Sequence, residues 1–471
     1  MRLVGGLCVA AILVITLVTR LHYLSAGSLN LDEGTYWLSL RAMQAGHPLY
    51  SSVYDSQPPA FLLLTEPGWA LLGGSIAAAR AVMVGWALVG VASGALIGWR
   101  LAGPAAGISI AAILAVDPMM VQQSVILQAD GPATALGLLA VAMATCALKD
   151  YRERAREVFA FLAGAVLVVG VLTKLLDAAV APVVAVTLIG TRPWRRIWLL
   201  ALAGGCVAGA ALLLPYVTAW SALWVQVIGM HLPDSSTVGA GISLSFLGAW
   251  ARLELPEIIL AALGVLLGWR NHPRLVTTGL VWIGGALVAV AATHPALQHY
   301  QIAISPGLAL LGGAALAQVA EWCGAGAHAR WTEAVLVAVL VTVAAIVLVG
   351  SLGNVQQLEV KPNPVQVASI RQLIPPGRQL LFGDDQFNEA LAGRQGPPYL
   401  IDTSLLRLHN SGLTPAALES RISGDPALCG VLFATNRLTT VQGFQEWVGI
   451  HFPDRSDLPG EAVMYRRAGC A

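Results

Sequence analysis

Two adjacent carboxylates, Asp32 and Glu33, stand shortly beyond an apolar run that extends from residue 3 to residue 21. Ionised groups near hydrocarbon are costly, so they usually pair with a cation or serve a function. A carboxylate that faces a bound hydroxyl can remove its proton in a transition state. The pair therefore indicates either a general base at the membrane surface or two solvated acids at the start of a surface helix.

Residues 33–46 have the pattern of an interfacial helix, inside a loop that we place at 25–58. Tyr36, Trp37 and Leu40 fall on one helical face, and polar residues fall on the others. We expect Asp32 at the N-cap of this helix, where backbone N–H groups and the helix dipole favour its ionised form.

A second acid and a cation lie at the predicted ends of later spans. Asp130 begins a span, and Pro132 just inside it is typical of an ordinary helix start. Lys174 follows the apolar run 157–173. It could pair with Asp177 on the same helix, extend its charge to the interface, or bind a phosphate.

Other polar side chains at the same predicted face are candidates for substrate binding, although an exposed turn or an interfacial position would also explain them. They are Asp55, Gln57, His231, His299 and Tyr300.

Composition predicts a polytopic membrane protein. The 471 residues are 56% hydrophobic and only 11% charged, and the mean hydropathy is +0.71. At ~20 apolar residues per span, we expect about 11 to 13 transmembrane helices. The net charge of +1 gives no support for nucleic-acid binding. The six cysteines form no CxxC pair or Cys/His cluster, so a structural zinc site is not expected.

Basic clusters at 149–156, 192–196 and 270–274 are predicted to be cytoplasmic. The loop 25–58 and everything after Ser351 are then external. Pro58 and Asp130 are then both external, so an even number of crossings must separate them. Three apolar stretches lie between these residues, at 59–73, 77–99 and 105–126, so one stretch must fail to cross. The first contains Glu66-Pro67 and the last Asp117-Pro118, either of which could break a helix.

After a polar linker at 351–364, residues 365–471 predict a small α/β domain with a largely parallel sheet. The expected strands are 380–382, 399–401 and 430–434. The expected helices are 364–373, 414–422 and 440–448.

The loop pattern resembles a known family. The pattern begins with DE-G-x-Y. It continues with Ala42, Gly46, Pro48 and Tyr50 in A-x-x-x-G-x-P-x-Y and ends with Pro58-Pro59. This pattern resembles the first external loop of GT-C glycosyltransferases. More narrowly, it is similar to the protein O-mannosyltransferase and aminoarabinose transferase branch. The resemblance implies a transmembrane catalytic domain over residues 1–350 with the GT-C fold.

The resemblance also implies roles for single residues. Asp32 would be the catalytic base, with Glu33 orienting it or a substrate and Asp130 as a second acid. Lys174 would hold the phosphate of a polyprenyl-phosphate sugar. Related enzymes carry an Arg-Tyr pair where this chain has His299-Tyr300, and a neutral histidine donates one bond where arginine offers a charged fork. The branch works without a bound divalent metal, so we expect neither metal nor cofactor.

These expectations combine into an inverting glycosyltransferase of the plasma membrane, with active site and tail domain extracytoplasmic. Its acceptor would be a lipid, a glycan or a protein. The alternative is a transporter or flippase of lipid-linked glycans, which predicts broken helices and polar residues at mid-membrane. A scaffold that displays the tail domain is a third reading, and it leaves the 25–58 loop unexplained. The polar residues here gather at predicted external ends, which favours the enzyme.

Overall fold

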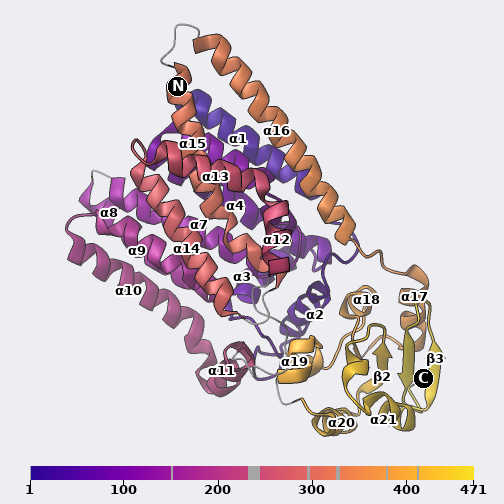
Figure 1. Ribbon diagram of the computed structural model, residues 1–471. Helices are drawn as coiled ribbons and strands as arrows, with labels where there is room; N and C mark the ends of the chain where they lie inside the picture. Colours follow the sequence, from indigo (N-terminus) through magenta and orange to yellow (C-terminus); the bar gives the residue numbers. More distant parts are fainter. Residues whose placement is uncertain are drawn as a thin grey trace.

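The computed structural model describes residues 2–149, 152–231, 244–293, 297–324, 329–377, 380–410 and 413–470. A bundle of long helices carries a small mixed domain at one end (Figure 1). The predicted fold class, a polytopic helical membrane protein with a C-terminal α/β domain, is confirmed.

Within the described residues, seven helical stretches are long and apolar enough to cross a membrane. Their main helices are α1 (Arg2–Leu21), α4 (Ile76–Ala102), α7 (Asp130–Lys149), α10 (Trp194–Leu213), α14 (Pro273–Ala292), α15 (Ser305–Gly324) and α16 (Ala329–Leu358). Shorter apolar helices are α3 (Ala60–Leu71), α5 (Pro104–Val116), η1 with α9 (Leu175–Val180, Ala181–Ile189) and α13 (Leu255–Gly268). Helix α8 (Glu153–Val171) packs between α7 and α10.

Short helices connect the long ones and build the end of the bundle next to the tail domain. They are α2 (Asp32–Gln44), α6 (Pro118–Gln123), η2 (Leu214–Ala219), α11 (Trp220–Val227), η3 (Gly229–His231), α12 (Leu244–Leu253) and η4 (Gln298–Ala303).

Helix α3 is the apolar stretch that does not cross. The backbone N–H of Ala60 donates to the carbonyl of Leu172 at 2.9 Å, and Trp37 Nε1 donates to the carbonyl of Gly74 at 3.1 Å. Both ends of α3 therefore lie at the α2 end of the bundle. Its 12 residues are also fewer than a span of ~20 requires.

Small residues set the spacing between α8 and α10. A Cβ added at Gly164 would lie 1.8 Å from the carbonyl oxygen of Ala201, and one added at Gly204 would lie 2.0 Å from that of Phe161. Only glycine permits this approach, which is the usual basis of helix packing in membranes. The close contact holds α8, whose end leads into Lys174.

The tail domain is a four-stranded sheet in the order β1-β2-β4-β3 with helices around it. The strands are β1 (Leu380–Gly383), β2 (Leu428–Phe433), β3 (Asp454–Asp457) and β4 (Val463–Arg466). The remaining elements are α17 (Pro364–Leu373), α18 (Gln386–Leu391), η5 (Pro398–Leu400), α19 (Leu405–Asn410), α20 (Pro415–Ser423), η6 (Leu438–Thr440) and α21 (Phe444–His451).

Three expectations for this region need correction. The sheet is mixed, because β1 pairs parallel with β2 whereas β4 is antiparallel to both β2 and β3. Residues 399–401 are not a strand: Pro398 opens a 3-10 helix there. Helix α16 continues to Leu358, so the first half of the predicted linker is helical.

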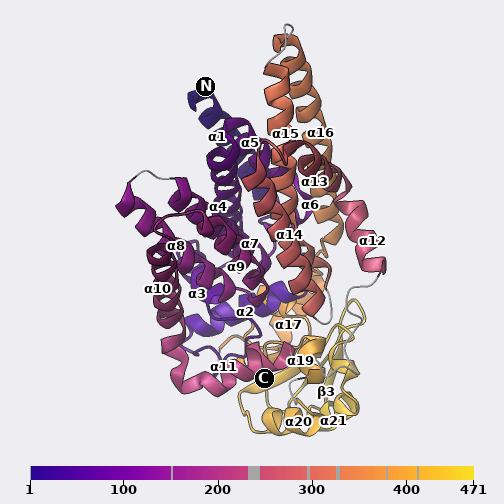
Figure 2. The same cartoon turned by 60° about the vertical axis from the view of Figure 1, so that its left-hand side comes forward.

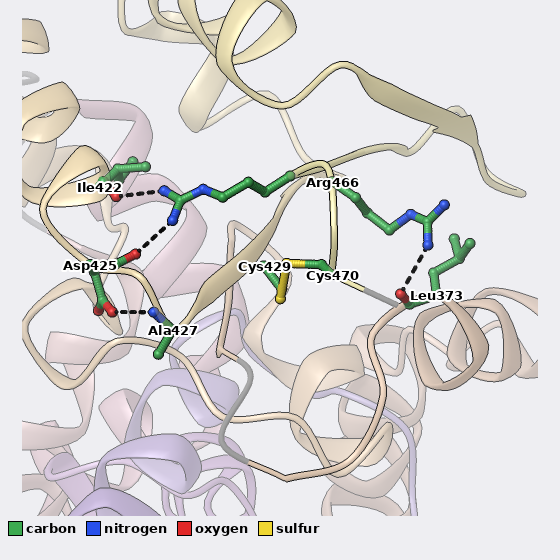
Figure 3. Close-up of a disulfide and its surroundings, with 8 residues drawn as sticks. Leu373, Ile422, Asp425, Ala427, Cys429, Arg466 and Cys470 are labelled. Atoms are coloured by element: carbon green, nitrogen blue, oxygen red, sulfur yellow. Dashed lines mark hydrogen bonds between the residues drawn. A yellow bond between two sulfur atoms is a disulfide. The ribbon is translucent and has the colours of Figure 1, made fainter.

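A disulfide between Cys429 and Cys470 closes the tail domain (Figure 3). It joins the buried strand β2 to the last described residues of the chain. Beside it, Arg467 donates to the carbonyls of Asp425 and Ile422, each at 3.1 Å. These bonds fix the C-terminal segment on the body of the domain.

Candidate active site

Asp32 opens α2 with its carboxylate free. It is the first helical residue rather than the N-cap, which is Leu31, so the N-cap expectation was wrong. The Asn30 side chain accepts the backbone N–H of Asp32 at 2.9 Å. Among the described residues, the Asp32 carboxylate makes no hydrogen bond or ion pair, and the residue is half-buried. Protein surrounds it while part of its surface stays accessible.

The groups around Asp32 come from both parts of the chain. The pKa of Asp32 is raised to about 6, chiefly by burial, and Asp402 and Asp130 contribute to this rise. Arg437 and Lys174 act in the opposite direction. The tail domain supplies Asp402 and Arg437, so Asp32 at the start of α2 lies where the bundle meets the tail domain (Figure 2).

Asp130, Lys174, His299 and Tyr300 form one cluster at the end of α7. Lys174 Nζ lies 2.7 Å from Asp130 Oδ2, and His299 Nε2 lies 3.9 Å from the same oxygen. Lys174 Nζ also stands 4.6 Å above the Tyr300 ring. The predicted helix pair between Lys174 and Asp177 does not form, because Lys174 binds across to α7 instead.

A small cavity of about 20 Å³ adjoins this cluster. Its polar walls are Asp130, Thr134, Lys174 and Asp177, and its apolar walls include Trp282 and Ile302. That volume admits about one water molecule. Asp177 is buried at this cavity. A Cβ added at Gly137 or at Gly170 would collide with its carboxylate, so both glycines are needed to make room for it.

Glu33 lies in the protein interior. Its side chain is fully buried and forms an ion pair with Arg80 at 2.7 Å. Its two oxygens also accept the backbone N–H groups of Leu127 at 3.0 Å and Leu29 at 2.8 Å. Arg80 in turn donates to the carbonyl of Ala26 at 2.7 Å. These contacts anchor the start of α2, next to Asp32.

The remaining predicted site residues lie nearer the tail domain. Asp55 is buried, and burial raises its pKa to about 8. Its Oδ1 accepts the backbone N–H of Gln57 at 3.0 Å, and its Oδ2 has no partner among the described residues. The Gln57 side chain is half-buried, with Nε2 3.4 Å from Ser56 Oγ. The backbone of His231 ends η3, and its side chain lies outside the described residues.

The tail domain docks directly on the first loop. The Arg407 guanidinium stands 3.6 Å from the centre of the Tyr54 ring. Arg41 donates to the carbonyl of Ala390 at 2.9 Å. A Cβ on Gly34 would lie 2.2 Å from the backbone nitrogen of Phe387, so α2 and α18 touch through their backbones.

Two residues near Asp32 are absent from the predicted site: Asp402, which the sequence offers only as a possible acceptor contact, and Arg437. Asp402 is buried, and one of its oxygens accepts the backbone N–H of Ser404 at 2.7 Å. Arg437 donates to Gln386 Oε1 at 2.9 Å and to the carbonyl of Asp384. No motif marks either residue, since their relevance arises only from the docking of the tail domain.

Comparison with solved structures identifies the fold. ArnT from Cupriavidus metallidurans, bound to undecaprenyl phosphate, superposes with a TM-score of 0.70 at 18% identity, over 99% of this chain and 98% of that one. AglB is an archaeal oligosaccharyltransferase from Archaeoglobus fulgidus, in complex with an inhibitory peptide and a dolichol-phosphate. It superposes with a TM-score of 0.59 at 12% identity, over 98% of this chain and 74% of that one. The protein has the GT-C fold. The expectation from the loop pattern is thereby confirmed for the fold.

A third GT-C structure matches a smaller part of its own chain. The arabinofuranosyltransferase AftD from Mycobacteria has a TM-score of 0.56 at 14% identity, over 92% of this chain and 37% of that one. No family model matches the sequence, and a search of curated proteins finds no match. At these identities the comparisons establish the fold, and the chemistry must be argued from the site.

The candidate site brings the unpaired Asp32 carboxylate near the ion pair of Lys174 with Asp130. An ionised Asp32 can accept a proton, and Lys174 with its neighbours can bind an anion. Within the described part of the chain, no group of three His, Cys, Asp or Glu side chains has the arrangement of a metal site.

Proposed function

We propose that the protein is an inverting glycosyltransferase that moves a monosaccharide from a polyprenyl-phosphate carrier to an acceptor hydroxyl. The observation that carries the proposal is the position of the unpaired Asp32 carboxylate near the Lys174–Asp130 pair, at one end of a bundle with the GT-C fold. Two solved neighbours are bound to carriers of this class, undecaprenyl phosphate and a dolichol-phosphate.

The reaction uses the two parts of the candidate site differently. Asp32 takes the proton of the acceptor hydroxyl as its oxygen attacks the anomeric carbon. The bond between that carbon and the phosphate oxygen breaks, and the carrier leaves as polyprenyl phosphate. Lys174, with His299 and Tyr300 beside it, compensates the charge that develops on the phosphate. Attack opposite the leaving group inverts the anomeric configuration.

We place the candidate site and the tail domain on the extracytoplasmic side of the plasma membrane. The disulfide between Cys429 and Cys470 supports this placement, because disulfides persist in oxidising compartments. The basic clusters at 149–156 and 192–196 lie at the opposite end of α7 and α8 from Asp130 and Lys174. That separation agrees with a cytoplasmic location for the clusters.

Reconstituted protein and labelled polyprenyl-phosphate sugars test the proposal. We expect transfer by the wild type and a loss of at least about 100-fold in Asp32→Asn, the usual contribution of a general base. Asp457→Asn, in an exposed pair with Arg455, is the matched control and keeps full activity. Retained transfer by Asp32→Asn would overturn the assignment. Movement of the carrier across liposomes without any transfer would point to the flippase instead.

A further inference from the structure

A second cavity lies at the other end of the bundle, and the proposed reaction does not use it. Its volume is about 180 Å³, well above the ~10–15 Å³ that one water requires. Helix α7 begins at Asp130 in the candidate active site, and its far end contributes Leu148 to this cavity. The remaining walls come from α4, α9 and α14: Leu101, Val186, Thr187, Gly190, Pro273, Arg274, Thr277 and Thr278.

One part of the wall is polar and one part is apolar. Arg274 and Thr277 belong to the first turns of α14, and neither side chain has a hydrogen-bond partner among the described residues. The hydroxyl of Thr278 instead donates to the carbonyl of Arg274 at 2.7 Å. Leu101, Leu148 and the exposed Val186 supply the apolar part. Val186 opens this part of the cavity to the outer surface of the bundle.

One cation lines the cavity, and three others are close to its wall residues in the sequence. Arg274 lines the cavity itself, Arg100 is next to Leu101, Lys149 is next to Leu148, and Arg192 is two residues beyond Gly190. In the described part of the chain, none of these four side chains is in an ion pair.

The described acidic side chains of this region already lie within ion-pair distance of other residues. Glu153 lies 3.5 Å from Arg196, and Glu157 lies 3.0 Å from it. Glu321 lies 3.5 Å from His272. Arg274 therefore brings a positive charge to the cavity, and no ion pair with a described acid neutralises it.

From this combination we infer that the cavity binds the phosphate of an anionic phospholipid in the leaflet at this end of the bundle. Arg274 and the Thr277 hydroxyl donate to the phosphate oxygens, since a guanidinium and a hydroxyl suit that geometry. An acyl chain follows Val186 and Leu101 toward the surrounding lipid. Basic pockets between transmembrane helices are known to bind anionic headgroups in this way. The inference does not depend on the proposed glycosyl transfer.

Lipid titration of the delipidated full-length protein, followed by native mass spectrometry, tests this site. We expect phosphatidylglycerol to bind at one per chain, about tenfold more tightly than phosphatidylcholine. The double variant Arg274→Gln/Thr277→Val should bind it about tenfold more weakly, because it loses charged hydrogen bonds. Arg195→Gln is the matched control: it removes an exposed charge at the same end without lining the cavity, and it should change binding by less than about twofold.

Three results would overturn the inference. An equal loss in Arg195→Gln would show a response to total charge rather than to a site. Displacement of the lipid by inorganic phosphate at equal concentration would show a site for a free anion. Absence of any preference for the anionic lipid would show that the cavity binds no phosphate. The melting temperature of each variant establishes that it is folded.

Discussion

At the scale of single residues, the protonation of Asp32 sets a measurable limit on activity. A general base must be ionised, and burial raises the pKa of Asp32 to about 6. We therefore expect kcat/KM to fall by about tenfold per pH unit as the pH drops below about 6, and to be flat above it. A pH profile of the free enzyme measures this limb. A limb near the ordinary aspartate pKa of about 4 would contradict the buried environment of Asp32.

Two substitutions in the tail domain should move the acidic limb of the pH profile in opposite directions. Asp402 raises the pKa of Asp32 and Arg437 lowers it, so Asp402→Asn should shift the limb to lower pH and Arg437→Gln to higher pH. The same pH profiles on the two variants measure this. Asp425→Asn, also in the tail domain and not among the groups that shift Asp32, is the control and should leave the limb in place. Identical shifts in both variants would show that they act only by loosening the fold.

Loss of the Glu33 carboxylate should lower the stability of the fold more than loss of the exposed Glu153 carboxylate does. Glu33→Gln leaves Arg80 charged and unpaired in a fully buried position, which usually costs about 3–5 kcal/mol. We expect a clearly lower melting temperature in detergent. Glu153→Gln breaks an exposed pair with Arg196 and should cost less than about 1 kcal/mol. Equal melting temperatures for the two variants would show that the buried pair does not anchor α2.

At the scale of elements, the contact between α2 and α18 joins the two parts of the site. In Gly34→Ala, the new Cβ would lie 2.2 Å from the backbone nitrogen of Phe387, so one helix must move. We expect faster proteolysis between Leu358 and Pro364 and reduced transfer. Gly85→Ala in α4, where a Cβ meets nothing within 4 Å, is the matched control. Unchanged proteolysis in Gly34→Ala would mean that the tail domain is held by other contacts.

The sequence predicts the elements on the bundle side of the site, but not the tail-domain elements that lie against them. Charge in the loops and the apolar spans place Asp32, Asp130, Lys174 and His299 at one face, because each span reverses the side of the next loop. Asp402 and Arg437 carry no such signal, since a soluble domain can dock in many ways. The helices α17, α20 and α21 follow from periodicity, whereas the β3–β4 hairpin, with its exposed strand DRSD, does not.

Within the bundle, one ambiguity needed tertiary contacts. Apolarity alone cannot separate a helix that crosses from one that lies across the end of the bundle. The bonds of Ala60 to Leu172 and of Trp37 to Gly74 show that α3 returns to its starting side. The pairing of Cys429 with Cys470, among six scattered cysteines, likewise depends on the register that brings β2 next to the C-terminal segment.

At the scale of the whole molecule, the disulfide tests which side of the membrane holds the tail domain. If that side is extracytoplasmic, Cys429 and Cys470 are oxidised in intact cells. A membrane-impermeant maleimide should then label them only after an impermeant reductant is added, and without permeabilisation. The four other cysteines, Cys8, Cys146, Cys206 and Cys323, belong to helices of the bundle and should stay unlabelled.

The variant Cys429→Ser/Cys470→Ser is the control for this labelling, because it removes both target thiols and leaves the other four. It should give no signal under any condition that spares the membrane. Labelling of the wild type only after permeabilisation would place the tail domain in the cytoplasm. Asp32 would then be cytoplasmic as well, since α2 and α18 are in backbone contact. The proposed donor would in that case be used from the inner leaflet, so this one measurement decides the sidedness of the whole reaction.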